Sequence, residues 1–387
     1  MSEENFKHPT TNTEHQVGKM VESEVAHRRQ FLLAVRLALD EFWLFSLWVT
    51  RMNTWNKLAL LVGAFLTAGS LVAAPAKWEP QKGDTIVILG NTFAERMEMF
   101  GYFESALHAK YPDRNLRVRS MAWSADAVSY QPRPYLFGDL KDKLSQPKDN
   151  PNPRAVWFNG VGADALILCF GMVESFDGEQ GLAKFRTDLN FYLKQHMEHQ
   201  YNGKSAPKML LVSPIAHENL GKPFPDGVQH NKDIARYVEV MRQVAEVNSV
   251  PFIDLFTPHM AWMKAHPNDK LTFNGIHQNE QGDWQFSQWM AQQLGWFDGK
   301  VAPGNGDEAK AFRELVKLKN ERFWLHFRAV NGEYIYGRRR QIWAQKVPMI
   351  PDDEMRRLWQ IDEDADQDLF KAKKPSIAAV WSGKPAK

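Results

Sequence analysis

Short apolar runs and longer amphipathic runs alternate along the chain from Lys77 onward, and this alternation is the strongest constraint on the fold. Five of the runs have the length and composition of strands: 85–89, 116–123, 165–170, 209–213 and 251–256. The amphipathic stretches predict helices at 94–110, 179–200, 231–249 and 280–294. Strands that alternate with helices predict a mostly parallel sheet that is covered on both faces.

In such sheets ligands bind beyond the carboxyl ends of the strands. That rule directs attention to the loops that follow four of the predicted strands and to the loop before the last helix of the sheet domain. These segments read "GNTF" (90–93), "WSAD" (123–126), "GMVESF" (171–176), "SPIAHE" (213–218) and "FNGIHQNEQG" (273–282). We therefore searched them for groups that could carry chemistry.

Composition excludes several classes of function. The formal net charge of +2 over 387 residues gives no overall reason to expect nucleic-acid binding. The only cysteine, Cys169, excludes an internal disulfide framework and every multi-cysteine metal site, and its apolar neighbours predict a buried core residue. His196 and His199 lie three residues apart on an expected helix, but no third ligand is nearby, so we expect a solvated helix face and no metal site.

The N-terminal region carries a targeting signal. Residues 58–73 form an uncharged apolar run that follows Lys57 and precedes the small residues up to Ala76. This pattern is typical of a secretory signal peptide, and the run is shorter than the ~20 residues of a membrane span. We expect residues 1–51 to be an extension outside the working protein, residues 52–76 to be the signal peptide, and the mature chain to be periplasmic or extracellular. An uncleaved membrane anchor with a cytoplasmic tail remains an alternative.

Beyond the sheet domain, expected at 77–298, a C-terminal extension occupies residues 299–387. The glycine-rich stretch 303–308 is typical of a linker, and 308–330 predicts one amphipathic helix. A turn, a short strand and a basic cluster are expected over 331–340. The tail from about residue 362 is charged and polar, so we expect it to be loose.

Four segments resemble the sequence blocks of SGNH (GDSL-type) hydrolases in order and in position relative to the strands. They read "VILGNTFAERM" (87–97), "SMAWSAD" (120–126), "FGMVES" (170–175) and "NGIHQNEQG" (274–282). The resemblance extends over roughly residues 83–296. It implies a three-layer α/β/α sandwich of the flavodoxin-like SGNH type with five strands, and hydrolysis of acyl or acetyl esters, often on lipids or carbohydrates.

The family's catalytic residues can be transferred position by position. A serine at the strand-to-helix turn attacks the carbonyl, and a histidine from the last loop activates it. His277 matches that histidine. Thr92 stands at the serine position, preceded by Asn91 where the family has aspartate, and Asn274 replaces the aspartate that orients the histidine. In another enzyme asparagine at that position lowered turnover about 10⁴-fold, because the histidine takes the wrong tautomer.

The resemblance also locates the groups that would stabilise the oxyanion. Ala125 stands at the family's second-block glycine, and its backbone N–H could still donate. Val173 replaces the third-block asparagine and offers no side-chain donor, although Asn91 could substitute for it. Glu174, which follows Val173, could orient a neighbour or accept a proton; its alternative role is a helix-entry or surface carboxylate. For Asn91 and Thr92 the alternative role is helix capping.

Further candidates lie in the same loops. Ser124 and Ser175 could supply a hydroxyl in place of Thr92, although loop hydrogen bonding is the ordinary role of such serines. Trp123, at the end of a predicted strand, could stack on a sugar ring. His217 could contact the substrate from the loop after the fourth strand.

Two functions follow from the sequence. The first is an exported ester hydrolase with a modified catalytic set, which predicts a hydroxyl within hydrogen-bond reach of His277. The second is an inactive binding module for a glycan or a partner protein. The segments "LGNTFAER", "YNGKSAP" and "SPIAHE" resemble a bacterial subgroup often joined to haem-binding modules. The chain has no C-x-x-C-H motif, so we expect no cofactor, and a haem or redox link would require a separate protein partner. The oligomeric state is open.

Overall fold

The computed structural model describes residues 77–132, 140–145, 160–302, 306–328, 341–342, 347–348 and 352–385. The predicted signal peptide, the extension before it and the basic cluster at 338–340 lie outside these residues. Pro75 to Lys387 forms one compact unit, so the sheet domain and the C-terminal extension belong to the same body.

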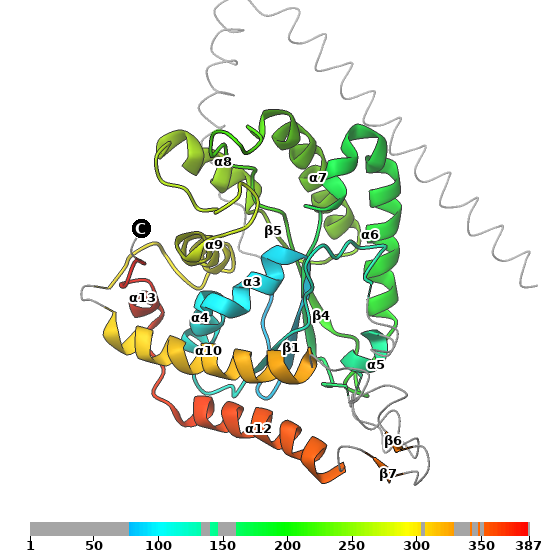
Figure 1. Ribbon diagram of the computed structural model, residues 1–387, viewed down its shortest axis with the longest axis vertical. Coiled ribbons are helices and arrows are strands. Elements are labelled where there is room, and N and C mark those ends of the chain that lie inside the picture. Colours follow the sequence, from blue (N-terminus) through cyan, green and yellow to red (C-terminus); the bar gives the residue numbers. More distant parts are fainter. Residues whose placement is uncertain are drawn as a thin grey trace, which may run out of the picture. The chain divides into compact units, whose positions relative to one another are not determined.

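A five-stranded parallel sheet lies at the centre of this unit (Figure 1). Its order is β2-β1-β3-β4-β5, and every neighbouring pair is parallel. The strands are β1 (Thr85–Gly90), β2 (Arg117–Ser120), β3 (Ala165–Cys169), β4 (Lys208–Val212) and β5 (Phe252–Ile253). These five strands confirm the predicted runs, although the second and the fifth are shorter than expected.

Helices cover both faces of the sheet, as the two hydrophobic cores show. Alternate residues of β1 point to opposite faces: Ile86 and Ile88 belong to one core, and Val87 and Leu89 belong to the other. The first core is closed by α3 (Thr92–Phe100), α4 (Tyr102–Lys110), α8 (Phe256–Ala265) and α9 (Glu280–Gln293). The second is closed mainly by α6 (Leu182–Met197) and α7 (Val228–Val247). The fold is therefore a three-layer α/β/α sandwich, as predicted.

Two helix predictions need correction. The single helix expected over 94–110 is two helices, α3 and α4, because Gly101 takes a left-handed conformation (φ 67°) and ends the first. α8 was not predicted, because Phe256 reads as the end of a strand and Pro258 argues against a helix, although proline is tolerated in a first turn. The solvated face expected around His196 is also wrong. This side chain is buried, and its Nδ1 lies 2.7 Å from the Tyr201 hydroxyl.

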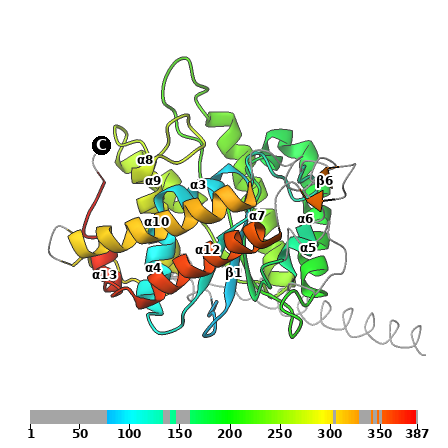
Figure 2. The same cartoon turned by 60° about the horizontal axis from the view of Figure 1, so that its bottom comes forward.

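The C-terminal extension is structured, and two of its helices lie side by side (Figure 2) at the β2 edge of the sheet. It contains α10 (Asp307–Phe327), the antiparallel pair β6 (Gln341–Ile342) and β7 (Val347–Pro348), α12 (Asp352–Lys371) and α13 (Ile377–Val380). The prediction of a loose tail from residue 362 is wrong, since Asp362 and Asp366 are buried. Asp366 forms a salt bridge with Arg119 of β2, and Asp362 lies 2.6 Å from His326 Nδ1 of α10.

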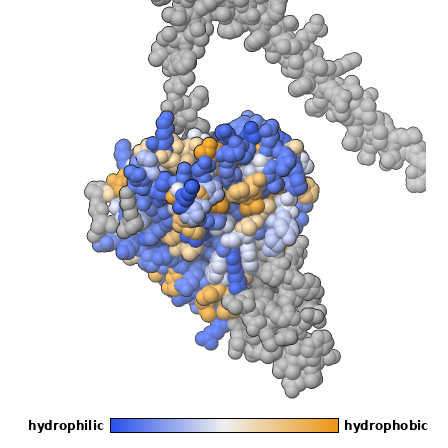
Figure 3. Space-filling view, turned by 45° about the horizontal axis from the view of Figure 1, so that its top comes forward, coloured by the Kyte–Doolittle hydropathy of each residue, from blue (hydrophilic) through white to orange (hydrophobic). Residues whose placement is uncertain are grey.

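Two further elements complete the described structure: the short helix α5 (Leu140–Leu144) and the 3-10 helix η3 (Glu174–Gly181). No helix in the described ranges combines the length and apolar character that a membrane crossing requires. On the face shown in Figure 3, hydrophobic residues gather in small patches among hydrophilic ones.

Candidate functional site

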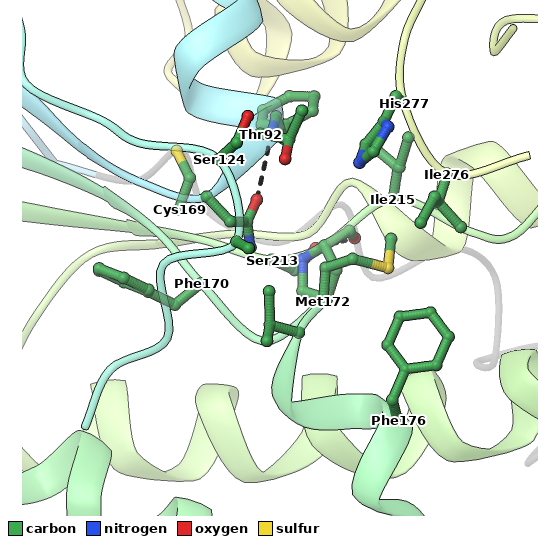
Figure 4. Close-up of a pocket in the computed structure, with 15 residues that line it drawn as sticks. Thr92, Ser124, Cys169, Phe170, Met172, Phe176, Ser213, Ile215, Ile276 and His277 are labelled. Carbon is green, nitrogen blue, oxygen red and sulfur yellow. Dashed lines mark hydrogen bonds between the residues drawn. The ribbon is translucent and has the colours of Figure 1, made fainter. Parts of the chain in front are cut away.

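A pocket of about 540 Å³ opens where the strands reach their carboxyl ends (Figure 4). It brings together Thr92, Ala125, Val173 and His277, which are far apart in the sequence. Its lining residues come from four post-strand loops and from the loop before α9: Asn91, Thr92, Phe93, Ser124, Ala125, Cys169, Phe170, Met172, Val173, Phe176, Ser213, Pro214, Ile215, Ile276 and His277. The pocket therefore lies where ligands bind in parallel α/β sheets.

The turn from β1 to α3 places Thr92 in this pocket. Gly90 (φ 144°) is required there, because a Cβ at this position would lie 2.2 Å from the carbonyl oxygen of Cys169. Asn91 caps α3: its Oδ1 accepts from the Phe93 N–H at 3.2 Å, and the residue is only 4% exposed. Thr92 is the first residue of the helix. Asn91 therefore performs the capping role and also lines the pocket.

The contact between Asn274 and His277 determines where the imidazole proton lies. Asn274 Oδ1 accepts from the backbone N–H groups of Ile276 (3.3 Å) and His277 (3.0 Å), so the amide nitrogen faces the ring. That Nδ2 lies 2.9 Å from His277 Nδ1 and can only donate. Burial and the neighbouring Arg96 lower the pKa of His277, so the ring is neutral at pH 7. A neutral ring that accepts at Nδ1 carries its proton on Nε2.

The hydroxyl groups near the pocket differ in their availability. Ser124 donates to Glu95, and Ser175 is buried, where it donates to the Met172 carbonyl at 2.7 Å. Across the described residues, the Thr92 hydroxyl has no hydrogen-bond partner, and no hydroxyl bonds to His277. The expected hydrogen bond between His277 and a rim hydroxyl is therefore not formed, and Thr92 is the free hydroxyl of the predicted set.

Backbone amides at the pocket provide hydrogen-bond donors. The N–H groups of Thr92 and Ala125 have no partner within the described part of the chain. Ala125 takes a left-handed conformation (φ 65°), which glycine adopts without strain but which is unfavourable for alanine. The backbone at Ala125 therefore has a conformation that favours glycine, the residue that the family resemblance places at this position. Val173 lines the pocket without a side-chain donor. Asn91 also lines it, and its Nδ2 has no hydrogen-bond partner among the described residues.

Glu174 connects two loops at the pocket rim through hydrogen bonds, and it does not line the pocket. Its carboxylate accepts from the N–H groups of Val128 (2.7 Å) and Gly171 (2.9 Å), which belong to the loops after β2 and β3. Burial raises the pKa of this carboxyl, and the two N–H donors oppose that rise. Both oxygens take part in these bonds, so Glu174 holds two neighbouring loops in place, and its expected role as a proton acceptor stays a prediction.

Trp123 and His217 also lie outside the pocket lining. The guanidinium carbon of Arg328, at the end of α10, lies 4.0 Å from the centre of a ring of Trp123, so this indole packs against the C-terminal extension. His217 is 6% exposed, and its Nδ1 lies 2.9 Å from Nδ1 of His230. These placements do not support the predicted sugar and substrate contacts.

Sequence reasoning missed two groups that position the site. Glu218 is fully buried and accepts from the N–H groups of Leu271 (3.0 Å) and Thr272 (2.8 Å), so it anchors the loop that carries His277. Arg328 lies 3.1 Å from Glu95, which holds Ser124. Glu218 lies in the "SPIAHE" segment, but its role depends on backbone groups of a distant loop that no local pattern reveals.

Neither a protein-family model nor a curated protein matches the chain. Among solved structures it is similar to a gut microbial diltiazem-metabolizing enzyme (18% identity, TM-score 0.44); the match covers 61% of this chain and 53%, about half, of that one. It is also similar to a candidate GDSL-like lipase from Parabacteroides merdae (15% identity, TM-score 0.43); this match covers 57% of this chain and 99% of that one. A catalytic mutant of an acetylxylan esterase from Geobacillus stearothermophilus is 13% identical (TM-score 0.40); this match covers 58% of this chain and 100% of that one.

These values describe a distant likeness, and what those proteins act on is a property of those proteins. The strand order, the parallel register and the meeting of the four sequence blocks at one pocket come from this chain itself. The chain has a three-layer α/β/α fold with the flavodoxin-like strand order 2-1-3-4-5.

Proposed function

We propose that this pocket binds an acyl or acetyl ester and hydrolyses it slowly, with Thr92 as the nucleophile and His277 as the base. The observation that carries the proposal is the meeting of a free hydroxyl, two free backbone N–H donors and an imidazole in one pocket. In the reaction, Thr92 Oγ1 would attack the ester carbonyl carbon and lose its proton to His277. The ester C–O bond would then break, the alcohol would leave with that proton, and a water molecule would hydrolyse the acyl group from Thr92 to release the acid. The N–H groups of Thr92 and Ala125 would donate to the oxygen that becomes negative.

The tautomer of His277 is the reason to expect a low rate. To take the Thr92 proton, the ring must present an unprotonated Nε2, so its proton must move to Nδ1 and face Asn274. The amide nitrogen of Asn274 cannot accept that proton. A reversal of the amide would break the bonds from Oδ1 to the Ile276 and His277 N–H groups. The productive arrangement is therefore a minor state, and turnover falls with its population.

The same contact favours a second candidate, a binding module that holds an ester or related group without cleaving it. In the major state His277 is a donor and not a base, which suits recognition of an oxygen atom. The two candidates predict different behaviour of Thr92, because only hydrolysis needs its hydroxyl as a nucleophile.

The test compares hydrolysis of p-nitrophenyl acetate and butyrate, and of an acetylated xylooligosaccharide, by the wild type and two variants. Thr92→Ala should abolish turnover, whereas Ser124→Ala should retain most of it, because the Ser124 hydroxyl is bound to Glu95. A fluorophosphonate probe should label the wild type and not Thr92→Ala. Equal turnover by wild type and Thr92→Ala would favour the binding module, and loss only in Ser124→Ala would transfer the nucleophile to that serine.

Export remains part of the proposal, supported by the apolar run at 58–73 and the small residues that follow it. N-terminal sequencing of the protein from its native host should find a mature chain beginning near Lys77. A chain that retains residues 58–73 and sediments with membranes would support the anchored alternative.

A further inference from the structure

A second pocket, of about 680 Å³, lies between α3 and α10, two helices that lie side by side (Figure 2). Glu98 and Met99 of α3 line it, and its other lining residues belong to α10. We infer that this α3/α10 pocket binds an aliphatic ammonium ion, with the cationic head at Glu98 and the hydrocarbon chain along the apolar side chains. The inference does not depend on the proposed function, because the two pockets share no lining residue.

The carboxyl group of Glu98 lacks a hydrogen-bond donor. Only 7% of this residue is exposed, and its Oε2 is buried without a hydrogen-bond partner among the described residues. Buried polar atoms nearly always have a partner. Burial raises the pKa of this carboxyl to about 8, although Arg328, Ser120 and Lys319 oppose that rise. The N–H groups of a bound ammonium ion would supply the donor for Oε2 and stabilise the ionised carboxylate.

The cations around Glu98 do not fill this role, because each has an acidic partner of its own. The basic side chains that line the pocket or act on Glu98 form three pairs: Lys317–Glu314 (3.0 Å), Lys319–Glu104 (2.6 Å) and Arg328–Glu95 (3.1 Å). Glu98 and Glu321, which both line the pocket, form no ion pair within the described ranges. A cationic ligand would therefore balance acidic charge that the chain leaves unpaired.

The end of α3 favours the same charge. Glu98 and Met99 lie in the last turn of this helix, which is the negative end of the helix dipole. Lysine or arginine often occupies such a turn, but this one has no basic side chain. A bound ammonium ion would lie where such a side chain is stabilising.

The rest of the pocket suits a hydrocarbon chain. Met99, Leu318 and Leu325 line it, and all three side chains are exposed. Leu318 and Leu325 are seven residues apart on α10, so they lie on one face of the helix, two turns apart. A small inorganic cation would leave this apolar surface in contact with water, whereas an alkyl chain would cover it.

The first experiment is calorimetric titration of the wild type at pH 8 with propylamine, hexylamine and hexanol. Both amines are charged at this pH, as a lysine side chain is. Affinity should rise from propylamine to hexylamine, by up to about fourfold for each methylene that becomes buried. Hexanol should bind at least about tenfold more weakly than hexylamine, because it lacks the charge. Equal affinity for the two would overturn the inference, and so would the absence of hexylamine binding.

The second experiment tests whether the cation meets Glu98, without any substitution in the chain. At pH 7 this carboxyl is mostly protonated, and a bound cation lowers its pKa, so up to about one proton should leave for each hexylamine bound. Titrations in phosphate and in Tris, which differ in their enthalpy of ionisation, count this proton. The affinity should also rise from pH 6 to pH 7, by up to about tenfold. Binding without proton release would overturn the assignment of Glu98.

Glu98→Gln keeps the shape of the side chain but cannot ionise. Hexylamine affinity at pH 8 should fall at least about tenfold, and the proton release should disappear. The matched control is Glu321→Gln, which removes a charge from an exposed side chain of the same pocket and should change the affinity by less than about threefold. An equal loss in both variants would mean that general negative charge attracts the amine, and the head site at Glu98 would be wrong.

Thr92→Ala separates this pocket from the one at the strand ends. This variant should bind hexylamine with wild-type affinity, because Thr92 does not line the α3/α10 pocket. A loss of hexylamine binding in Thr92→Ala would place the amine in the other pocket and overturn the inference. A wild type that binds hexylamine as described but cleaves no ester would remove the proposed hydrolase and leave the inference intact.

Discussion

The pocket at the strand ends and the helices beside β2 differ in whether their polar groups have partners. Beside β2, buried charges are paired: Lys319 of α10 lies 2.6 Å from Glu104, and Asp366 of α12 pairs with Arg119. In the pocket, the N–H groups of Thr92 and Ala125 have no partner in the described structure. Thr92 is half-buried and Ala125 is exposed, so their N–H groups are open to solvent or to a ligand, whereas the buried charges beside β2 are paired and hold structural elements together.

The largest effect is expected from restoring the pocket to the family pattern. The triple variant Thr92→Ser, Asn274→Asp, Val173→Asn supplies an unhindered nucleophile, a partner for Nδ1–H and a third oxyanion donor. We expect kcat/KM for p-nitrophenyl butyrate to rise on the order of 10²–10⁴-fold, with Asn274→Asp giving the largest single increase. No increase would mean that the pocket is adapted for binding alone, which would sharpen the contrast with an enzyme site.

The paired side of the comparison is tested by Lys319→Met. This change leaves Glu104 buried with only His108 beside it, so the free energy of unfolding should fall by about 3–5 kcal/mol. Urea unfolding followed by circular dichroism measures the effect. The control is Lys317→Met on the same helix, where an exposed pair with Glu314 is lost and the change should stay below about 1 kcal/mol. An equal loss of unfolding free energy in both variants would mean that the buried pair contributes no more to stability than the exposed pair.

The same pair should make stability depend on acid pH. Although burial opposes its ionisation, Lys319 and His108 hold the pKa of Glu104 at about 2, below the ordinary 4.5. Its stabilising contribution is therefore complete above pH 4.5 and is lost as the pH falls toward 2. Unfolding of the wild type and Glu104→Gln at pH 7, 4 and 3 should show a difference that shrinks with falling pH. A difference independent of pH would show that Glu104 is not held as a carboxylate.

The smallest effect is expected at the strained residue of the pocket. Ala125→Gly removes a Cβ from a left-handed conformation and should stabilise the protein by up to about 1 kcal/mol. Ala127→Gly in the same loop, where φ is not positive, should instead destabilise it by roughly 0.5–1 kcal/mol. Thermal unfolding distinguishes the two. Destabilisation in both variants would mean that Ala125 is not strained.

The central part of the fold could be predicted because it depends on local pattern. The three central strands β1, β3 and β4 are largely buried apolar runs, and turns or helices separate them, so periodicity finds them. The packing of the C-terminal helices could not be predicted from local pattern. Asp362 and Asp366 read as parts of a polar tail, because their partners, His326 and Arg119, lie far away in the sequence. Composition cannot show that a charged residue will be buried against a distant partner.

The candidate site also has features that the sequence predicts and features that it does not. The positions of Thr92, Ala125 and His277 follow from the order of the sequence blocks and from the rule that parallel strands present their loops at one edge. The tautomer of His277 does not, because it depends on which atom of Asn274 the backbone N–H groups take. The occupied oxygens of Glu174 were equally hidden, since their donors are backbone groups of two separate loops.

Glu218 has a consequence for the motion of the His277 loop. Its carboxylate, anchored after β4, accepts from two amides of that loop and from the His259 ring, whose Nε2 lies 3.3 Å away. Loops usually open readily, and their amides then exchange with solvent within a short time. The amides of Leu271 and Thr272 should instead exchange nearly as slowly as those of the central strands. The imidazole would then be held as rigidly as a group within the sheet, and this rigidity would persist without any substrate.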